Sequence, residues 1–385
     1  MYSLLQNDPK PSGTKIESAF DGNICRYFIV YITIILICII NLLNLRCTGY
    51  RSILDGMKTF ASDANPIDLE ELHKLKCINK GTSLCTQNKK VHIIKDDLQW
   101  FAPNNMDSLY TLLTQYQQSN YRLVAANTIV GIYPEDNPFD VYIAIKDIPE
   151  LYQVVKTNTS ITIGSMITVT KLIELFDLFS KFDGYQYLSE ISTHMQKVGN
   201  TSIRNIATWG GNLIMKYNHL SAGSDIFVCL EAINATIRLV GPSKSSAPID
   251  VSPLTLLKTP IKGKCIYSMT LKPFDMNSTI IKSYKVMPRS QNSRAYVNCA
   301  FNFQINPQNS VVKSCSMVFG GLSGDFVHAN QTEKLWINKS LNDQKAIDEC
   351  FQILRSELKV DEIPVINYLK YLISKLCYSY FFNFK

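Results

Sequence analysis

The sequence has no run of like charges. Its 39 lysine and arginine residues and its 32 aspartate and glutamate residues are dispersed, and the net charge of +7 is small for 385 residues. Proteins that bind nucleic acid usually concentrate basic residues in a block or on one face. The sequence therefore argues against nucleic acid as a partner.

The chain also lacks the features of a secreted protein. Residues 1–26 contain no apolar core segment and carry charges such as Asp8, Lys10 and Glu17, which a signal peptide would not. The 11 cysteines are odd in number and irregularly spaced, unlike a disulfide framework. We expect a reducing compartment.

One segment lacks charge altogether. Residues 27–45 are 19 uncharged residues, mostly Ile, Leu, Phe, Tyr and Val, interrupted by Thr33, Asn41 and Asn44. That length is sufficient for a helix that crosses a bilayer. The same composition also results from translating AT-rich non-coding sequence, so a retained intron or a gene-model error is the alternative.

The remaining composition and periodicity predict an α+β protein. Hydrophobic residues make up 46% and charged residues 18%, as in folded domains with substantial cores. Apolar spacing predicts helices over 107–116, 170–179, 224–231 and 343–358. Short β-rich runs predict strands over 123–125, 141–145, 265–271, 296–305 and 311–319.

Two turns rich in small residues are candidates for binding a diphosphate. The first runs Leu123-Val124-Ala125-Ala126-Asn127-Thr128-Ile129-Val130-Gly131, and the second runs Thr208-Trp209-Gly210-Gly211-Asn212 at the start of a predicted helix. Small residues let the backbone approach a ligand, and successive N–H groups can cradle an anion. An ordinary turn and a tightly packed helix start remain the alternatives.

Asp225 follows in Ser224-Asp225-Ile226-Phe227. Its carboxylate can accept hydrogen bonds from sugar-alcohol hydroxyls, or it can cap the helix that begins there. Local sequence favours the cap.

Taken together, these segments resemble the xanthine dehydrogenase/aldehyde oxidase family, the molybdenum hydroxylases, and within it the insect aldehyde-oxidase-like branch. The first turn matches the family's L-V-x-G-N-T-x-x-G flavin loop except at Ala126, and the second matches its S-x-G-G-N element with Thr208 for Ser. Asp225 falls at the family's flavin-hydroxyl aspartate, Ile266 at an apolar flavin contact and Lys285 at a flavin-contacting lysine, with Arg289 following.

The resemblance implies a domain organisation. Residues 91–275 would form a PCMH-type FAD-binding domain in two subdomains, and 280–358 a CO-dehydrogenase-flavoprotein-like domain of a sheet with helices. Residues 63–90 would be a linker, and 359–385 a lead into a molybdenum cofactor domain that the chain lacks. FAD is the expected cofactor: the two turns would hold its diphosphate, Asp225 its polyol, and Lys285 would place positive charge near the ring.

The resemblance also explains the segment around the apolar residues. The family's iron–sulfur helical domain ends in G-N-L-C-R-C-T-G-Y-R, and removing residues 27–46 joins Cys25-Arg26 to Cys47 in that pattern. Residues 1–62 would then be a partial, helical [2Fe–2S]-binding domain interrupted by an apolar insert. A cluster needs two further thiolates, so Cys25 and Cys47 are expected to be vestigial ligands. Cys77 and Cys85, with His73 nearby, are too few for a zinc site.

The function implied by the resemblance is electron transfer. The chain would pass electrons from iron–sulfur clusters to FAD and then to NAD or oxygen, as part of a cytoplasmic, homodimeric oxidoreductase. The alternative is a non-catalytic remnant without flavin, tethered to a membrane if 27–45 is a true span. Enzyme activity of the chain by itself is left open.

Overall fold

The computed structural model describes residues 8–13, 15–16, 58, 61–63, 91–95, 98–133, 139–287, 292–321 and 327–358. The chain divides into two compact units, Met1–Asn88 and Lys89–Lys385. In the first unit, Ser62 N donates to Pro11 O over 2.9 Å and Gly13 N donates to Asp63 Oδ1 over 2.8 Å. The predicted insert 27–46, nearly all of the linker 63–90 and the lead 359–385 fall outside the described residues.

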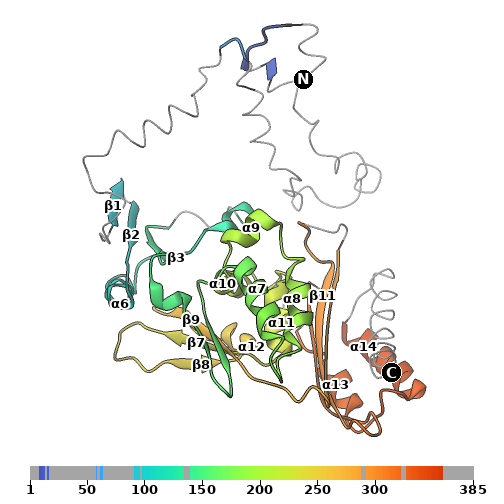
Figure 1. The fold of residues 1–385 in the computed structure, drawn as a ribbon. Coiled ribbons are helices and arrows are strands. Elements are labelled where there is room, and N and C mark those ends of the chain that lie inside the picture. The colour runs from blue at the N-terminus through green and yellow to red at the C-terminus, as the bar shows by residue number, and fades with distance from the viewer. Residues whose placement is uncertain are drawn as a thin grey trace. The chain divides into compact units, whose positions relative to one another are not determined.

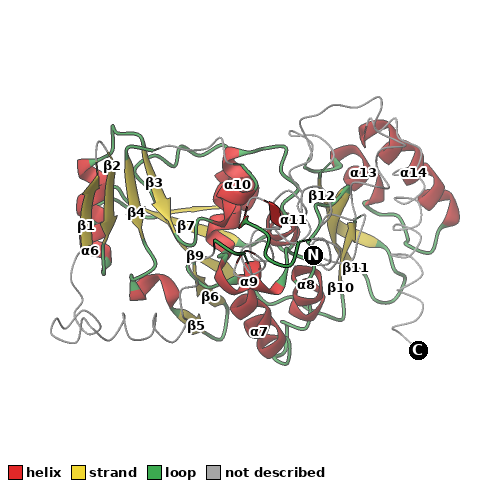
Figure 2. Cartoon of the chain, turned by 90° about the horizontal axis from the view of Figure 1, so that it is seen from above, coloured by secondary structure: helices red, strands yellow, loops and turns green. Residues whose placement is uncertain are grey.

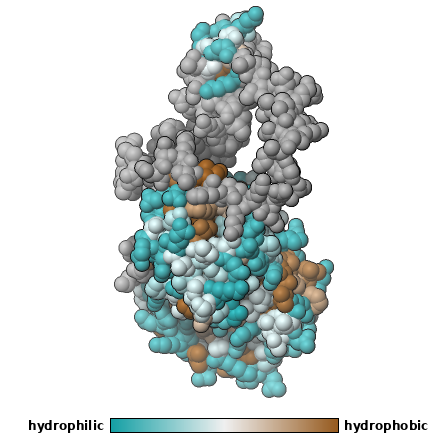
Figure 3. All heavy atoms as spheres, turned by 90° about the vertical axis from the view of Figure 1, so that its left-hand side faces the viewer, coloured by the Kyte–Doolittle hydropathy of each residue, from teal (hydrophilic) through white to brown (hydrophobic). Residues whose placement is uncertain are grey.

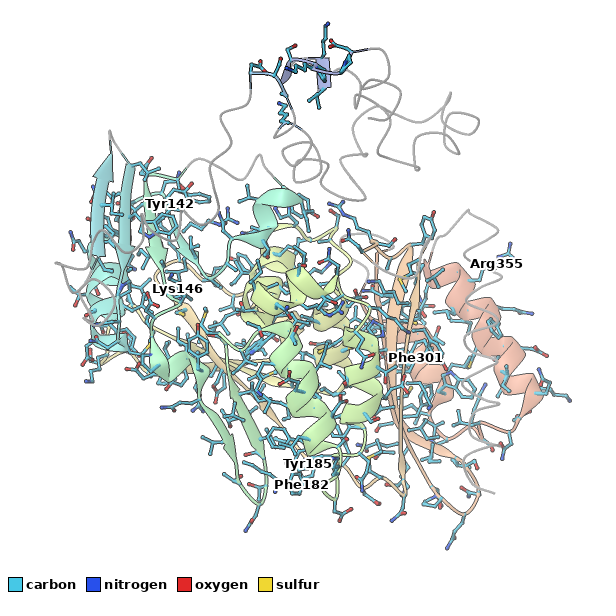
Figure 4. All side chains as sticks on the ribbon, turned by 45° about the horizontal axis from the view of Figure 1, so that its top comes forward. Tyr142, Lys146, Phe182, Tyr185, Phe301 and Arg355 are labelled. Carbon is cyan, nitrogen blue, oxygen red and sulfur yellow. The ribbon has the colours of Figure 1, made fainter. Side chains whose placement is uncertain are left out.

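The second unit begins with a mixed sheet of strand order β1-β2-β4-β3. Its strands are β1 (Val91–Lys95), β2 (Leu98–Ala102), β3 (Tyr121–Val124) and β4 (Val141–Ala144). Helix α6 (Met106–Gln115) buries Leu109 and Leu113 in the same core cluster as Ile143. Figure 4 labels Tyr142 on β4 and Lys146 just after that strand, which locate this sheet.

A second sheet, antiparallel throughout, has the order β5-β6-β9-β7-β8. Its strands are β5 (Val154–Lys156), β6 (Ile161–Gly164), β7 (Thr236–Val240), β8 (Ile249–Val251) and β9 (Cys265–Leu271). The helices of the same part of the chain are α7 (Val169–Phe179), α8 (Leu188–Met195), α9 (Thr201–Ile206), α10 (Trp209–Asn218), α11 (Asp225–Ala232) and α12 (Pro253–Leu256). Helix α7 buries Leu172, Phe176 and Phe179, the spacing of one helical face.

The third sheet is antiparallel with the order β10-β11-β12. It comprises β10 (Thr279–Val286), β11 (Val297–Ile305) and β12 (Val312–Gly320), with helices α13 (Asn330–Trp336) and α14 (Gln344–Leu358). Phe301, Phe319 and Trp336 share one fully buried cluster with side chains of α14. Phe301 and Arg355 locate β11 and α14 in Figure 4.

Helix α11 lies between the second and third sheets. Every residue of α11 except Glu231 is buried, as expected for a helix that is packed on all sides. Its apolar side chains share a core cluster with Ala300 and Val318 of the third sheet, and Asn302 Nδ2 donates to Ala232 O over 3.0 Å. Figures 1 and 2 show α8 and α11 beside the strands of the third sheet.

The predicted α+β class is confirmed. Strand 265–271 coincides with β9, and the other predicted helices and strands lie within two residues of the observed ones. On the face shown in Figure 3, hydrophilic side chains predominate and the apolar ones form small patches. None of the helices in the described ranges combines the length and apolar character needed to span a bilayer.

Candidate functional site

The first small-residue turn follows the carboxyl end of β3. Asn127 adopts the left-handed conformation, with φ of 53° and ψ of 29°, and the 3-10 helix η1 (Thr128–Gly131) begins after it. Within the described residues, the N–H groups of Asn127, Thr128 and Ile129 donate to no acceptor. A left-handed residue followed by a helical turn directs successive N–H groups to one side, where they can bind an anion.

Space is available at the end of this turn. A Cβ atom built on Gly131 would meet no atom within 4 Å. Ala126, which departs from the family pattern, is exposed rather than packed. The turn therefore tolerates the Ala126 methyl group without crowding in the protein itself.

The second turn forms the start of α10. Thr208 is its N-cap, and Thr208 Oγ1 accepts a hydrogen bond from Gly211 N over 3.1 Å. Trp209 is fully buried, and its Nε1 donates to Gly164 O over 2.7 Å. A Cβ atom on Gly210 would lie 2.9 Å from Ser165 O. Glycine is thus required here because the helix start presses against the backbone that follows β6.

Two contacts link the first turn to elements that adjoin the second turn, one of them at the C-terminal end of α10. Met166, next to Ser165, belongs to the same apolar cluster as Leu123 and Ala125 of the first turn. The Tyr133 ring, just beyond the first turn, stacks on His219 at the end of α10 with 3.6 Å between centroids. Both turns are therefore held against the same framework.

Asp225 is the centre of a buried polar cluster. Its Oδ2 lies 2.6 Å from Lys285 Nζ, and its Oδ1 lies 2.8 Å from Asn298 Nδ2 and 3.2 Å from His194 Nε2. Burial by itself would raise the pKa of Asp225, but the His194 hydrogen bond and the Lys285 charge outweigh it and lower the pKa to about 2. Asp225 is therefore a carboxylate at neutral pH.

The cluster adjoins the second turn. Ser224, directly before Asp225, donates from Oγ to Asn212 Oδ1 over 2.5 Å. Ser224 is also the N-cap of α11, and its Oγ accepts from Phe227 N. The expectation that Asp225 caps this helix is wrong, because Ser224 occupies the cap and the Asp225 side chain faces the interior.

The two predicted flavin contacts Asp225 and Lys285 are bonded to each other. Lys285 Nζ also donates to Lys197 O over 2.8 Å, and its side chain is only 2% exposed. Ile266 lies on β9 and is 5% exposed, in the same core cluster as Trp209. Arg289 falls outside the described residues.

The sequence-based predictions missed His194 and Asn298. His194 lies on α8 and Asn298 on β11, and neither sits in a recognisable motif. Both are fully buried polar residues in apolar surroundings. Only their burial, which sequence does not reveal, marks them as members of the cluster.

No metal centre is found in the parts of the chain that the structure describes, since no group of three or more potential ligands comes together there. Cys25, Cys47, Cys77 and Cys85 all lie outside those parts. The vestigial [2Fe–2S] ligands and the apolar segment 27–45 therefore stay predictions.

Comparisons with known proteins agree with this geometry. Residues 96–251 match the family model for the FAD binding domain in molybdopterin dehydrogenase, and residues 282–372 match that for the CO dehydrogenase flavoprotein C-terminal domain. The chain is 28% identical to the abscisic-aldehyde oxidase of Arabidopsis thaliana over 89% of its length, and 24% identical to aldehyde oxidase 4 of Mus musculus over 99%. It spans only 27% and 30% of those two proteins.

Solved structures show the same fold. A carbon monoxide dehydrogenase chain from Hydrogenophaga pseudoflava superimposes with a TM-score of 0.60 at 16% identity, covering 74% of this chain and 96% of the other. A quinoline 2-oxidoreductase chain from Pseudomonas putida 86 gives a TM-score of 0.58 at 14% identity, with 72% and 96% covered. This chain therefore contains an FAD-binding domain of the molybdopterin dehydrogenase type followed by a CO dehydrogenase flavoprotein C-terminal domain, and it is a homologue of the plant and mammalian aldehyde oxidases.

Proposed function

We propose that the chain binds FAD between its two small-residue turns and serves as the electron-transferring flavin portion of an aldehyde oxidase-like oxidoreductase. The observation that carries the proposal is that two backbone segments suited to an anion pack on one framework. The N–H groups of Asn127, Thr128 and Ile129, which have no acceptor among the described residues, form the first segment, and the start of α10 at Gly210 forms the second. A dinucleotide diphosphate is the ligand whose charge and slender shape such segments accept.

The residues of the chain fit this cofactor. Gly131 leaves open space, and Gly210 and Gly211 carry no side chain that would obstruct a diphosphate at the helix start. When bound, FAD supplies a ring that exchanges electrons with donors and acceptors. Lys285 has three N–H groups, of which two are engaged by Asp225 and Lys197, and the third has no acceptor among the residues that the structure describes.

In the complete protein, we propose that electrons reach the flavin from iron–sulfur clusters and leave to NAD or oxygen. Assembly as a homodimer in the cytoplasm belongs to the same proposal. The support is the resemblance to the xanthine dehydrogenase/aldehyde oxidase family and the homology to aldehyde oxidases over residues common to both.

One observation favours the alternative, a remnant without flavin. Asp225 and Lys285 form an ion pair in the interior, so the two charges balance each other without a bound ligand. Such a remnant would be tethered to a membrane if residues 27–45 form a span.

The deciding experiment is the flavin content of the purified full chain, compared with a variant that lacks residues 27–46. We expect a yellow protein with about one FAD per chain in both, identified after release by denaturation. A folded, colourless chain that takes up no added FAD would establish the remnant. Sequencing the transcript across codons 26–47 would show whether the apolar segment is translated.

A further inference from the structure

We infer that His194 is a positioning residue for the candidate flavin site: it holds the Asp225 carboxylate, which in turn holds the Lys285 ammonium. The inference rests on the proposed function, because it concerns the cationic group offered to the flavin. His194 belongs to neither of the two turns and to none of the predicted contacts. Among the described residues, its contact with the site is the hydrogen bond to Asp225.

The hydrogen-bond partner of His194 determines its tautomer. The side chain is 0% exposed, and Nε2 lies 3.2 Å from Asp225 Oδ1. A carboxylate with a pKa of about 2 only accepts, so Nε2 carries the hydrogen. Within the described residues Nδ1 is buried and has no partner.

The Lys285 ammonium is held from one side by the end of α8 and the residues after it. Lys197 O accepts one of its N–H groups directly, and His194 fixes the carboxylate that accepts another. Asn298 Nδ2 donates to the same carboxylate oxygen as His194. Three groups, from α8, β10 and β11, therefore surround the buried negative charge of Asp225 on α11.

The cluster balances its charges inside the protein. The Asp225 carboxylate and the Lys285 ammonium lie 2.6 Å apart, and His194 and Asn298 both place a nitrogen within hydrogen-bond distance of the same carboxylate oxygen. Losing the His194 donor would therefore loosen the carboxylate that holds Lys285 in place.

Other ionisable groups lie around the cluster. The neighbouring groups are Glu190 and Lys197 on the α8 side, Cys229 on α11 and Cys299 on β11. Burial raises the pKa of both thiols, so they stay neutral. Glu190 Oε1 is engaged by Ser283 N and Oγ. Helix α7, which packs on α8, keeps Lys171 and Glu174 at the surface.

The test uses the full chain with three substitutions. His194→Leu removes the donor to Asp225, His194→Gln keeps a donor that does not titrate, and Ser192→Ala is the matched control. Ser192 is fully buried on the same helix, and its Oγ has no partner in the described residues. The measurements are the acid-unfolding midpoint without flavin and the Kd for FAD.

The acid-unfolding arm needs no flavin. Without the His194 donor, burial raises the pKa of Asp225, so the midpoint of acid unfolding should rise by about one pH unit in His194→Leu. His194→Gln and Ser192→Ala should match the wild type. An unchanged midpoint in His194→Leu would show that His194 does not hold Asp225, and would overturn the inference.

The FAD-binding measurement distinguishes a failure of the role of His194 from a failure of the proposed function. His194→Leu should bind FAD about tenfold more weakly, whereas His194→Gln should stay within about threefold. Ser192→Ala should bind FAD as tightly as the wild type. Equal affinities in all four proteins would refute the role of His194 and leave the proposed function intact. A wild-type chain that takes up no FAD would refute the proposed function and, with it, this role.

Discussion

His328 Nε2 lies 3.2 Å from Glu231 Oε1 and His328 Nδ1 lies 2.9 Å from Glu333 Oε1, although Glu231 is 97 residues away in the chain. Glu231 belongs to α11 and Glu333 to α13, so one imidazolium joins the FAD-binding domain to the C-terminal domain. Burial would lower the pKa of His328, but its hydrogen bonds to the two carboxylates raise it to about 9.

This arrangement predicts a loss of stability at alkaline pH. The pKa in the folded chain lies above the ordinary value of 6.5, so the contribution is complete below pH 6.5 and is lost as the pH rises through about 9. Between pH 6 and pH 9.5, urea unfolding of the wild type should lose about 2 kcal/mol more than that of His328→Gln. His219→Gln should behave like the wild type, and an equal alkaline loss in His328→Gln would contradict the assignment.

Replacing only one member of the buried ion pair of Lys285 and Asp225 should strongly destabilise the folded protein. Lys285→Met leaves the Asp225 carboxylate without its cation, and the free energy of unfolding should fall by about 3–5 kcal/mol. The double variant Lys285→Met/Asp225→Leu removes both charges and should recover a large part of that loss. Urea unfolding of the two single variants and the double variant measures the coupling, and additive losses would show that the pair does not interact.

The close approach of α10 to the end of β6 predicts that Gly210 cannot be replaced. In Gly210→Ala the new methyl group would lie 2.9 Å from Ser165 O, a backbone atom that cannot rotate away. The free energy of unfolding should fall by about 1–3 kcal/mol. Gly131→Ala places its methyl group in open space and is the matched control for thermal unfolding. A Gly210→Ala chain as stable as the wild type would mean that the two segments separate easily.

Gly131 also distinguishes cofactor binding from stability. If FAD occupies the open space beside Gly131, then Gly131→Ala should leave thermal unfolding unchanged and weaken FAD binding about tenfold. Ala126→Gly changes an exposed residue of the same turn and should alter the Kd for FAD by less than about threefold. The Kd is measured by quenching of flavin fluorescence. Equal Kd values for wild type and Gly131→Ala would place the diphosphate elsewhere.

Much of the fold was predictable because local patterns and packing agree. The apolar spacing of α7 reflects a single buried face, so periodicity identified this helix. The β-rich composition of β9 identified that strand, which is buried on both faces. The strand β10 was missed because polar residues such as Lys282 and Ser283 interrupt it, and their role in meeting Glu190 arises only from tertiary structure.

Part of the candidate site was predictable from local sequence, and part of it depends on tertiary structure. The two turns were predicted because glycines and small residues at fixed spacing are local features. The bond between Lys285 and Asp225 joins residues 60 positions apart, and His194 and Asn298 complete it from two further elements. Resemblance identified Asp225 and Lys285 separately, but their mutual contact depends on how α8 and α11 pack on the third sheet.

The burial of α11 on all sides has a consequence for how the chain folds. The helix contributes to the core of one domain while its other surface is covered by β11 and β12 of the next. Either half produced alone would expose an apolar helix or an apolar sheet face to water, at a large hydrophobic cost. The two halves are therefore expected to unfold in a single cooperative transition, and neither is expected to be stable alone, although they match separate family models.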